Sequence, residues 1–443
     1  MRRIATILLL LTALVSCSKI DIFTGISGQE GGREGGRATK TGGDTEEIRN
    51  VMILYSAGFN SLASFLDENI EDLQKGDIPA YRTGYDDVLL VYSRLTPRSS
   101  SSGRCMSVYS TPTESALFRI YKKGEEIVRD TLKVWGKEVD ACNPETMREV
   151  LQMAHDRFPA KSYGMVFSSH ASGWLPSGYY LNPDNFENVT VWSAPARMRR
   201  VQGTFPAIES FPAVKSMGQD NNPDNSVEME IDVFAEAIPY RLDYLIIDAC
   251  LAGCVEIAYE LRGKADIVGY SQAEVLAGGF NYQGMTSKLL QETPDPIGVC
   301  RDYFNRYDSQ SGVYRSATIS VIDTRKMDSL ASVCKSLFEK YRSTISTMNG
   351  SPVQGYFRYN RHFFYDLEDV LIQAGIDEDE KEQLSAALRE CVLYNAATEY
   401  FISIKINTAC GFSMYLPSMG SSFLDNFYTT HVAWNKATEL VKE

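Results

Sequence analysis

Residues 243–250 read DYLIIDAC, and residues 163–170 read YGMVFSSH. Each segment is a short, uninterrupted apolar run, which is typical of a strand buried on both faces of a parallel sheet. One run ends in a cysteine and the other in a histidine, two residue types that serve nucleophilic catalysis. These two segments therefore predict both the class of the fold and the place of its chemistry.

Further apolar runs of the same kind precede and follow these two segments. They are VMILYSA at 51–57, DVLLVYS at 87–93, SALFRIYK at 115–122, ADIVGYS at 265–271, SATISVID at 316–323 and GFSMYLP at 411–417. Helices are expected at 62–74, 144–158, 229–238, 251–262, 325–347 and 377–399. The alternation of buried strands with helices predicts an α/β fold, with a mainly parallel sheet flanked by helices on both faces.

The first fifty residues predict export. Residues 1–16 have a basic start and an apolar run too short to span a bilayer, as in a signal peptide. The run ends in LVSC, which resembles a bacterial lipobox, so Cys17 is the expected lipidation site; an ordinary secretory signal is the alternative. Residues 17–50 are rich in glycine and predict a flexible tether. We expect an exported bacterial lipoprotein anchored to the cell envelope, on its periplasmic or its surface side.

The composition and apolar pattern of the remaining chain indicate two regions. Residues 51–322 are expected to form the α/β core, and residues 323–443 a helical C-terminal region with one late strand. An insertion rich in Pro, Asn and Ser, 175–226, interrupts the core and has a possible hairpin near 189–193. The acids near its end are interpreted as a solvated loop that leads into a helix: Asp220, Asp224, Glu228, Glu230 and Asp232.

The composition excludes several classes of function. The 443 residues carry 44 Lys and Arg against 57 Asp and Glu, and the formal net charge of −13 argues against a nucleic-acid partner. Nine cysteines are too few for a disulfide scaffold. No Cys/His pair has zinc spacing and no glycine-rich phosphate loop follows a strand, so the sequence requires no cofactor.

Cys250 and His170 are the candidates for catalysis. The carboxyl ends of parallel strands meet at one edge of a sheet, so the two residues are expected to lie close together. A cysteine between a strand and the next helix is activated by the helix dipole and by free N–H groups. A histidine on a neighbouring strand end can take the thiol proton or protonate a leaving amine. The other histidines, His155, His362 and His431, have no such partner pattern.

The two strand ends resemble those of the clostripain-like cysteine peptidases, family C11 of clan CD, whose fold is shared with caspases, gingipains and legumain. In that family one apolar strand ends in His-Gly-Ser-Gly-Trp, and a later one ends in Asp-Ala-Cys followed by Leu and small residues. The motifs here are HASGW at 170–174 and DACLAG at 248–253, and the resemblance spans about 51–320. It implies a caspase-like fold and an exported cysteine endopeptidase, with His170 as general acid/base and Cys250 as nucleophile.

The resemblance also implies roles for the residues around this pair. The backbone N–H groups of Cys250 and Ala171 would form the oxyanion hole, although Ala171 replaces a family glycine and tolerates positive φ poorly. Cleavage is expected after Arg or Lys, with Asp248 as one acid of the substrate pocket. The second family acid lies in a Pro-Gly loop after the next strand. Glu274 is the last acid of that loop here, which loosens the expected preference.

Other outcomes stay open at this point. A caspase-like lipoprotein with weak or no turnover would act as a binding or scaffolding module, and a transpeptidase would pass the thioester to an amine. Arg197, Arg199 and Arg200 form either a self-cleavage site or part of a solvated loop. A calcium requirement follows from the resemblance only. The expected partners are peptide or protein substrates and, through the lipid anchor, the membrane.

Overall fold

The computed structural model describes residues 48–81, 87–106, 111–180, 183, 186, 216–222, 225–357 and 362–442. The expected signal peptide, Cys17, nearly all of the tether, the hairpin near 189–193 and the arginines at 197–200 lie outside these residues. None of the described helices is both long and apolar enough to cross a membrane.

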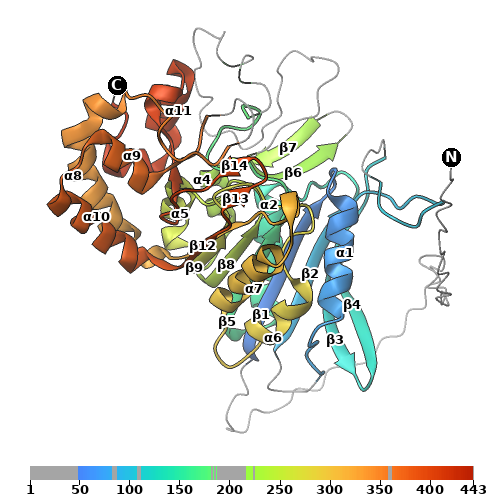
Figure 1. Cartoon of the computed structure of the whole chain (residues 1–443). Helices are drawn as coiled ribbons and strands as arrows, with labels where there is room; N and C mark the ends of the chain where they lie inside the picture. The colour runs from blue at the N-terminus through green and yellow to red at the C-terminus, as the bar shows by residue number, and fades with distance from the viewer. Residues whose placement is uncertain are drawn as a thin grey trace, which may run out of the picture. The chain divides into compact units, whose positions relative to one another are not determined.

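A nine-stranded sheet forms the centre of the fold (Figure 1). From one edge to the other, its strands are β12 (Val392–Ala397), β10 (Thr318–Asp323), β9 (Ala265–Tyr270), β8 (Leu242–Asp248), β5 (Ala160–Ser168), β1 (Ile48–Gly58), β2 (Val88–Leu95), β3 (Ser115–Lys123) and β4 (Glu126–Trp135). The central strands from β9 to β2 pair in parallel, and antiparallel pairs extend both edges. The predicted α/β fold with a mainly parallel sheet is confirmed.

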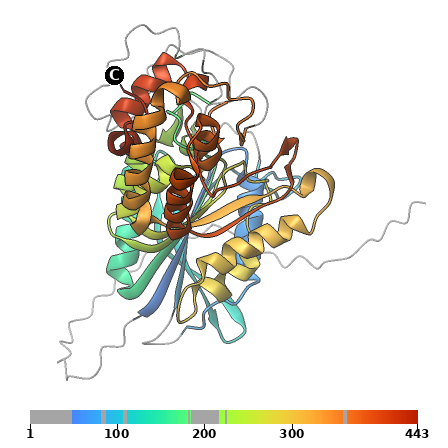
Figure 2. The same cartoon turned by 60° about the vertical axis from the view of Figure 1, so that its left-hand side comes forward.

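Helices cover both faces of this sheet (Figure 2). One face packs against α1 (Ala63–Gln74), α6 (Met285–Leu289) and α7 (Pro296–Asp308). The other face packs against α2 (Pro144–Arg157), α4 (Ile231–Ala237), α5 (Val255–Glu260) and α8 (Met327–Ile345). The C-terminal helices α9 (Leu367–Ala374), α10 (Glu378–Cys391) and α12 (Ala433–Thr438) contact α8, and α11 (Ser422–His431) contacts α12.

The continuous apolar strands are explained by the two cores. On β1, Met52 and Leu54 join the core beneath α1, α6 and α7, whereas Val51, Ile53 and Tyr55 join the core on the opposite face. Burial of each such side chain stabilises the fold by about 1.5–3 kcal/mol. Both faces are covered, so both sets of alternate positions in the middle of the strand are apolar.

Two predictions in the C-terminal region need correction. The helix expected over 377–399 ends at Cys391, and the residues that follow form β12, which pairs antiparallel with β10. Val, Leu and Tyr at 392–394 suit a strand better than a helix, and the free edge of β10 supplies the hydrogen bonds. The late strand at 411–417 is confined to β15 (Ser413–Met414), which pairs with β11 (Tyr365–Asp366).

Of the acids interpreted as a solvated loop that leads into a helix, Asp220 and Glu228 lie instead on the paired strands β6 (Met217–Asn222) and β7 (Asn225–Met229). The predicted helix is present as α4, with Glu230 at its N-cap and Asp232 in its first turn, and Asp224 lies outside the described residues. Asp220 is fully buried and accepts hydrogen bonds from Arg94 Nη1 at 3.0 Å and from the Cys142 N–H at 3.2 Å. Burial raises the pKa of Asp220 to about 6, against the opposing effect of Arg94. A buried ion pair therefore ties β6 to the body of the protein.

Candidate active site

The ends of β5 and β8 bring the two predicted catalytic residues to the same edge of the sheet. These neighbouring strands run in parallel, with Ser168 opposite Asp248 as the last pair. His170 and Cys250 each follow that pair by two residues. The Ser169 N–H donates to the Asp248 carbonyl at 3.4 Å, which joins the two loops directly beyond the sheet.

The turn after Cys250 is strained and is held by the segment that follows β9. Leu251 lies in the left-handed region with a φ of 59°, which costs a residue with a β-carbon about 1–2 kcal/mol. The Leu251 N–H donates to the Ala273 carbonyl at 2.9 Å, and the Gly253 N–H donates to the Ser271 carbonyl at 2.7 Å. These bonds stabilise a tight turn directly after the candidate nucleophile.

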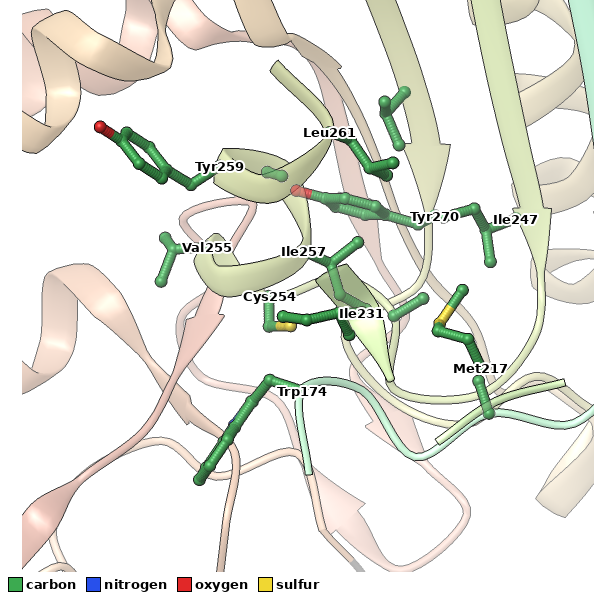
Figure 3. Packing of buried hydrophobic residues seen from close by; sticks show 14 of the residues in the cluster. Trp174, Met217, Ile231, Ile247, Cys254, Val255, Ile257, Tyr259, Leu261 and Tyr270 are labelled. Atoms are coloured by element: carbon green, nitrogen blue, oxygen red, sulfur yellow. The ribbon is translucent and has the colours of Figure 1, made fainter. Parts of the chain in front are cut away.

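The Cys250 sulfur contacts the backbone of Val275. The Val275 N–H donates to Sγ at 3.4 Å, and Sγ lies 3.7 Å from the Val275 carbonyl oxygen. The N–H group stabilises a thiolate, whereas the carbonyl oxygen accepts a hydrogen bond from the protonated thiol. Cys250 is half-buried, whereas Cys254 is fully buried, and Figure 3 shows Cys254 among apolar side chains such as Ile257. Burial raises the pKa of the Cys254 thiol well above its usual range.

His170 is buried and has contacts from a loop and from a strand. Its Nε2 lies 3.0 Å from Ser61 Oγ, in the loop that follows β1. Its carbonyl accepts a hydrogen bond from the Gly218 N–H at 2.9 Å, near the start of β6. Ser61 belongs to no motif and is 109 residues from His170, so the sequence offers no signal for it.

The Ala171 backbone forms an antiparallel bridge with Met217. In this bridge the His170 carbonyl and the Ser172 N–H face β6, so the Ala171 N–H points to the other side of the chain. Ala171 is not among the described residues with a positive φ. Alanine therefore fits this position without backbone strain, although the family motif has glycine here.

The Asp248 carboxyl is buried at the end of β8. Its Oδ2 accepts hydrogen bonds from the Tyr282 hydroxyl at 2.5 Å and from the Ser168 hydroxyl at 3.4 Å. Gly279 has a φ of 57°, and a β-carbon on it would lie 2.6 Å from Asp248 Oδ2. Burial raises the pKa of Asp248 to about 6. The carboxyl is therefore half ionised near pH 6 and carries nearly its full negative charge only above about pH 7.

Glu274, the other predicted pocket acid, comes from the loop after β9. It is half-buried and directly precedes Val275, whose N–H contacts the Cys250 sulfur. The structure thus places Glu274 beside the Cys250 turn, while Asp248 lies at the end of the preceding strand.

The family of the chain is decided by a comparison with protein-family models. The model described as the clostripain family of C11 peptidases matches residues 54–184 and 205–441. Both strand ends, with His170 and Cys250, lie inside the matched ranges. The chain belongs to the clostripain family. The predicted resemblance is thereby confirmed, and the enzyme class is that of the cysteine peptidases.

Solved structures of clostripain-family proteases share the fold. An inactive zymogen C11 protease from Parabacteroides distasonis is 23% identical with a TM-score of 0.66, over 88% of this chain and 97% of its own. A secreted C11 cysteine protease from Bacteroides thetaiotaomicron is 22% identical with a TM-score of 0.66, over 88% and 99%. A secreted C11 cysteine protease from the same organism, solved in complex with an irreversible peptide inhibitor, is 20% identical with a TM-score of 0.67, over 88% of this chain and 99% of its own. No curated protein matches this chain.

In this clostripain-family chain the C-terminal region supports both loops of the candidate site. Trp174, the last residue of the histidine motif, packs against Tyr415 and Tyr428, with ring centroids 4.8 and 5.1 Å apart. Its side chain is visible in Figure 3. On the cysteine loop, the Gly253 carbonyl accepts a hydrogen bond from the Ser413 N–H at 2.8 Å. Both loops therefore depend on the chain beyond residue 400 for their packing.

Glu256, on α5, is fully buried at this contact. Its Oε1 accepts hydrogen bonds from the Tyr428 hydroxyl at 2.7 Å and the Tyr415 N–H at 2.9 Å. Its Oε2 has no hydrogen-bond partner within the described part of the chain. Burial raises the pKa of Glu256 to about 7.

Replacing Glu256 with glutamine is expected to stabilise the protein above pH 7. A carboxyl with a raised folded-state pKa contributes its full stability below its unfolded pKa, and this contribution is lost as pH rises through the folded pKa. The shift from 4.5 to about 7 corresponds to about 3 kcal/mol in the free energy of unfolding. Glutamine keeps the accepting oxygen and carries no charge.

Urea unfolding between pH 5 and pH 8 checks this expectation. The free energy of unfolding of Glu256→Gln should fall less steeply with pH than that of the wild type. Glu382→Gln, at an exposed glutamate, is the matched control and should keep the wild-type slope. Equal slopes for wild type and Glu256→Gln would contradict the prediction.

The other histidines pack against aromatic side chains. His155 lies beside Tyr163 and Tyr240, His362 beside Phe357, and His431 beside Phe427. Among the described residues, no group of three or more His, Cys, Asp or Glu side chains could hold a metal ion.

Proposed function

We propose that this chain is an exported cysteine endopeptidase of clostripain type, with His170 and Cys250 as its catalytic dyad. The observation that carries the proposal is the register of β5 and β8. In this clostripain-family chain the two strands end at the same pair of residues, so the loops with His170 and Cys250 begin side by side. Cys250 also combines partial exposure with a backbone N–H donor to its sulfur. These are the properties of a reactive cysteine.

In the proposed reaction, His170 takes the thiol proton and Cys250 Sγ attacks the scissile carbonyl carbon. The backbone N–H groups of Cys250 and Ala171 bind the resulting oxyanion. Removal of one such donor lowers kcat by about 10²- to 10³-fold in other enzymes. His170 then protonates the leaving amine. In the second step His170 takes a proton from a water molecule, which attacks the thioester and releases the Cys250 thiol. The backbone conformation of Ala171 supports turnover over the alternative of a binding or scaffolding module.

The proposed substrates have Arg or Lys before the scissile bond. A cationic side chain loses several kcal/mol of hydration in a pocket unless an anion pairs with it. Asp248 lies two residues before the nucleophile, and Glu274 lies in the loop whose next residue contacts the Cys250 sulfur. We assign the main role to Asp248 and a weaker one to the more exposed Glu274.

Export and anchoring are proposed from the N-terminal sequence. Residues 1–16 would be removed as a signal peptide, and a lipidated Cys17 would hold the body through the tether 17–50. The body would comprise the core at 51–322 and the C-terminal region at 323–443. The Bacteroides thetaiotaomicron relative is described as secreted, which supports export. The partners are then peptide or protein substrates and the membrane of the cell envelope.

A covalent probe tests the proposed dyad and its specificity together. We expect a peptidyl-Lys acyloxymethyl ketone to label the mature protein on the peptide that contains Cys250, as read by mass spectrometry. The His170→Ala variant should lose this labelling because its thiol is no longer activated. A peptidyl-Leu probe should label at least about tenfold more slowly.

Two results would contradict the proposal in different ways. Labelling at another cysteine would remove Cys250 from its role. Equal labelling rates for the Lys and Leu probes would leave the dyad in place and remove the basic specificity.

A further inference from the structure

The ring of His170 has a hydrogen-bond partner from a loop other than that of the nucleophile. In the sheet, β5 lies between β1 and β8, and Ser56 of β1 stands opposite Ser168 of β5. The loop after β1 therefore begins on the side of β5 that is opposite the Cys250 loop. From that loop, Ser61 Oγ lies 3.0 Å from His170 Nε2.

The backbone around Ser61 is fixed by the buried side chain of Asn60. Asn60 Nδ2 donates to the Ala57 carbonyl at 3.0 Å and to the Gln219 carbonyl at 2.8 Å. Asn60 Oδ1 accepts a hydrogen bond from the Leu62 N–H at 2.8 Å. This turn connects β1, β6 and the start of α1, so the Ser61 hydroxyl is presented from an ordered loop.

Because Ser61 Oγ occupies Nε2, Nδ1 is the ring nitrogen left to exchange a proton with the nucleophile. A neutral imidazole has one N–H and one lone pair. When Nε2 carries the hydrogen and donates it to Ser61 Oγ, the lone pair is on Nδ1. In the imidazolium both nitrogens carry hydrogen, and Nε2–H still donates to Ser61. The Ser61 bond therefore persists through the reaction, and the proton moves only at Nδ1.

We propose that Ser61 is a positioning residue for His170, which holds the ring with Nδ1 available to Cys250 and stabilises the imidazolium. The inference rests on the proposed function of the dyad. Ser61 acts through the histidine ring, in the way that a hydrogen-bonded partner fixes the tautomer and orientation of a catalytic histidine. Ser61 is exposed, so removal of its hydroxyl leaves no cavity in the core.

Steady-state kinetics of Ser61→Ala from pH 5 to pH 9 test this role. We expect kcat for a peptidyl-Arg reporter to fall about 10- to 100-fold, while KM changes less than about twofold. The alkaline limb of the kcat/KM profile should move to lower pH by about one unit, because the imidazolium loses an acceptor. Ser61→Thr keeps a hydroxyl and should restore most of kcat.

A second serine serves as the matched control. Ser287 is also exposed, and its hydroxyl donates to the Gly284 carbonyl at 3.0 Å. Ser287→Ala should retain the wild-type kcat and pH profile. The melting temperatures of both alanine variants should stay close to that of the wild type, which separates positioning from stability.

Unchanged kcat and an unchanged alkaline limb in Ser61→Ala would overturn the inference, as would a Ser61→Thr variant that is impaired as strongly as the alanine variant. An inactive wild-type protein that also fails to label at Cys250 would overturn the proposed function and this inference together. An active protein that is insensitive to Ser61→Ala would overturn this inference alone.

Discussion

Replacing Cys250 with alanine should lower kcat/KM for a peptidyl-Arg reporter by about 10³-fold or more. The variant has no atom that can form the thioester, so any residual rate comes from substrate binding and oxyanion stabilisation. The turn around the residue should survive, because Leu251 and Gly253 hold it through backbone hydrogen bonds to 271–273. Substrate affinity should therefore change little, and the loss should appear in kcat.

Cys254→Ala is the matched control for this experiment. Cys254 is four residues from Cys250, fully buried, and has a thiol whose pKa burial raises well above its usual range. We expect its removal to lower the free energy of unfolding by about 1–2 kcal/mol and to change kcat less than about threefold. If Cys254→Ala abolished hydrolysis and Cys250→Ala spared it, the assignment of the nucleophile would be wrong.

The sheet and the position of the site can be predicted from the sequence because their signals are local. A run such as YLIID at 244–248 alternates between two buried faces, and this shows in the run itself. The histidine and the cysteine stand directly after two such runs. Parallel strands end at one edge, so the sequence predicts that both residues lie on that edge. That they are neighbours follows from the pairing of β5 with β8, which the sequence does not show.

The contacts that complete the site are not local, and the sequence does not show them. Ser61 and Val275 approach the dyad from loops 109 and 25 residues away, and neither belongs to a motif. The burial of Asp220 depends on Arg94, 126 residues earlier, although the composition around Asp220 is that of a loop. The strand β12 likewise forms because it pairs with the edge of β10, although the sequence before it has the pattern of a helix.

Replacing Asp248 with asparagine should lower kcat/KM for peptidyl-Arg and peptidyl-Lys reporters by about 10²- to 10³-fold. A cationic side chain that enters the pocket would lose its paired anion, which costs about 3–5 kcal/mol at a buried site. Asparagine keeps an oxygen that can accept hydrogen bonds from Tyr282 and Ser168, the two partners of the wild-type carboxylate. A reporter with citrulline, the uncharged analogue of arginine, should therefore be cleaved by both proteins at rates within about threefold.

The selectivity of the wild type should also change with pH, because kcat/KM reports the ionisation of the free enzyme. Burial raises the pKa of Asp248 to about 6, so the carboxylate is lost as pH falls below that value. The ratio of kcat/KM for the arginine and citrulline reporters should rise between about pH 5 and pH 7 and then level off, and in Asp248→Asn it should stay flat. Glu274→Gln is the control and should keep the rise. If the rise disappeared in Glu274→Gln and persisted in Asp248→Asn, the charge that selects basic residues would come from the loop after β9, and Asp248 would serve only to hold Tyr282 and Ser168.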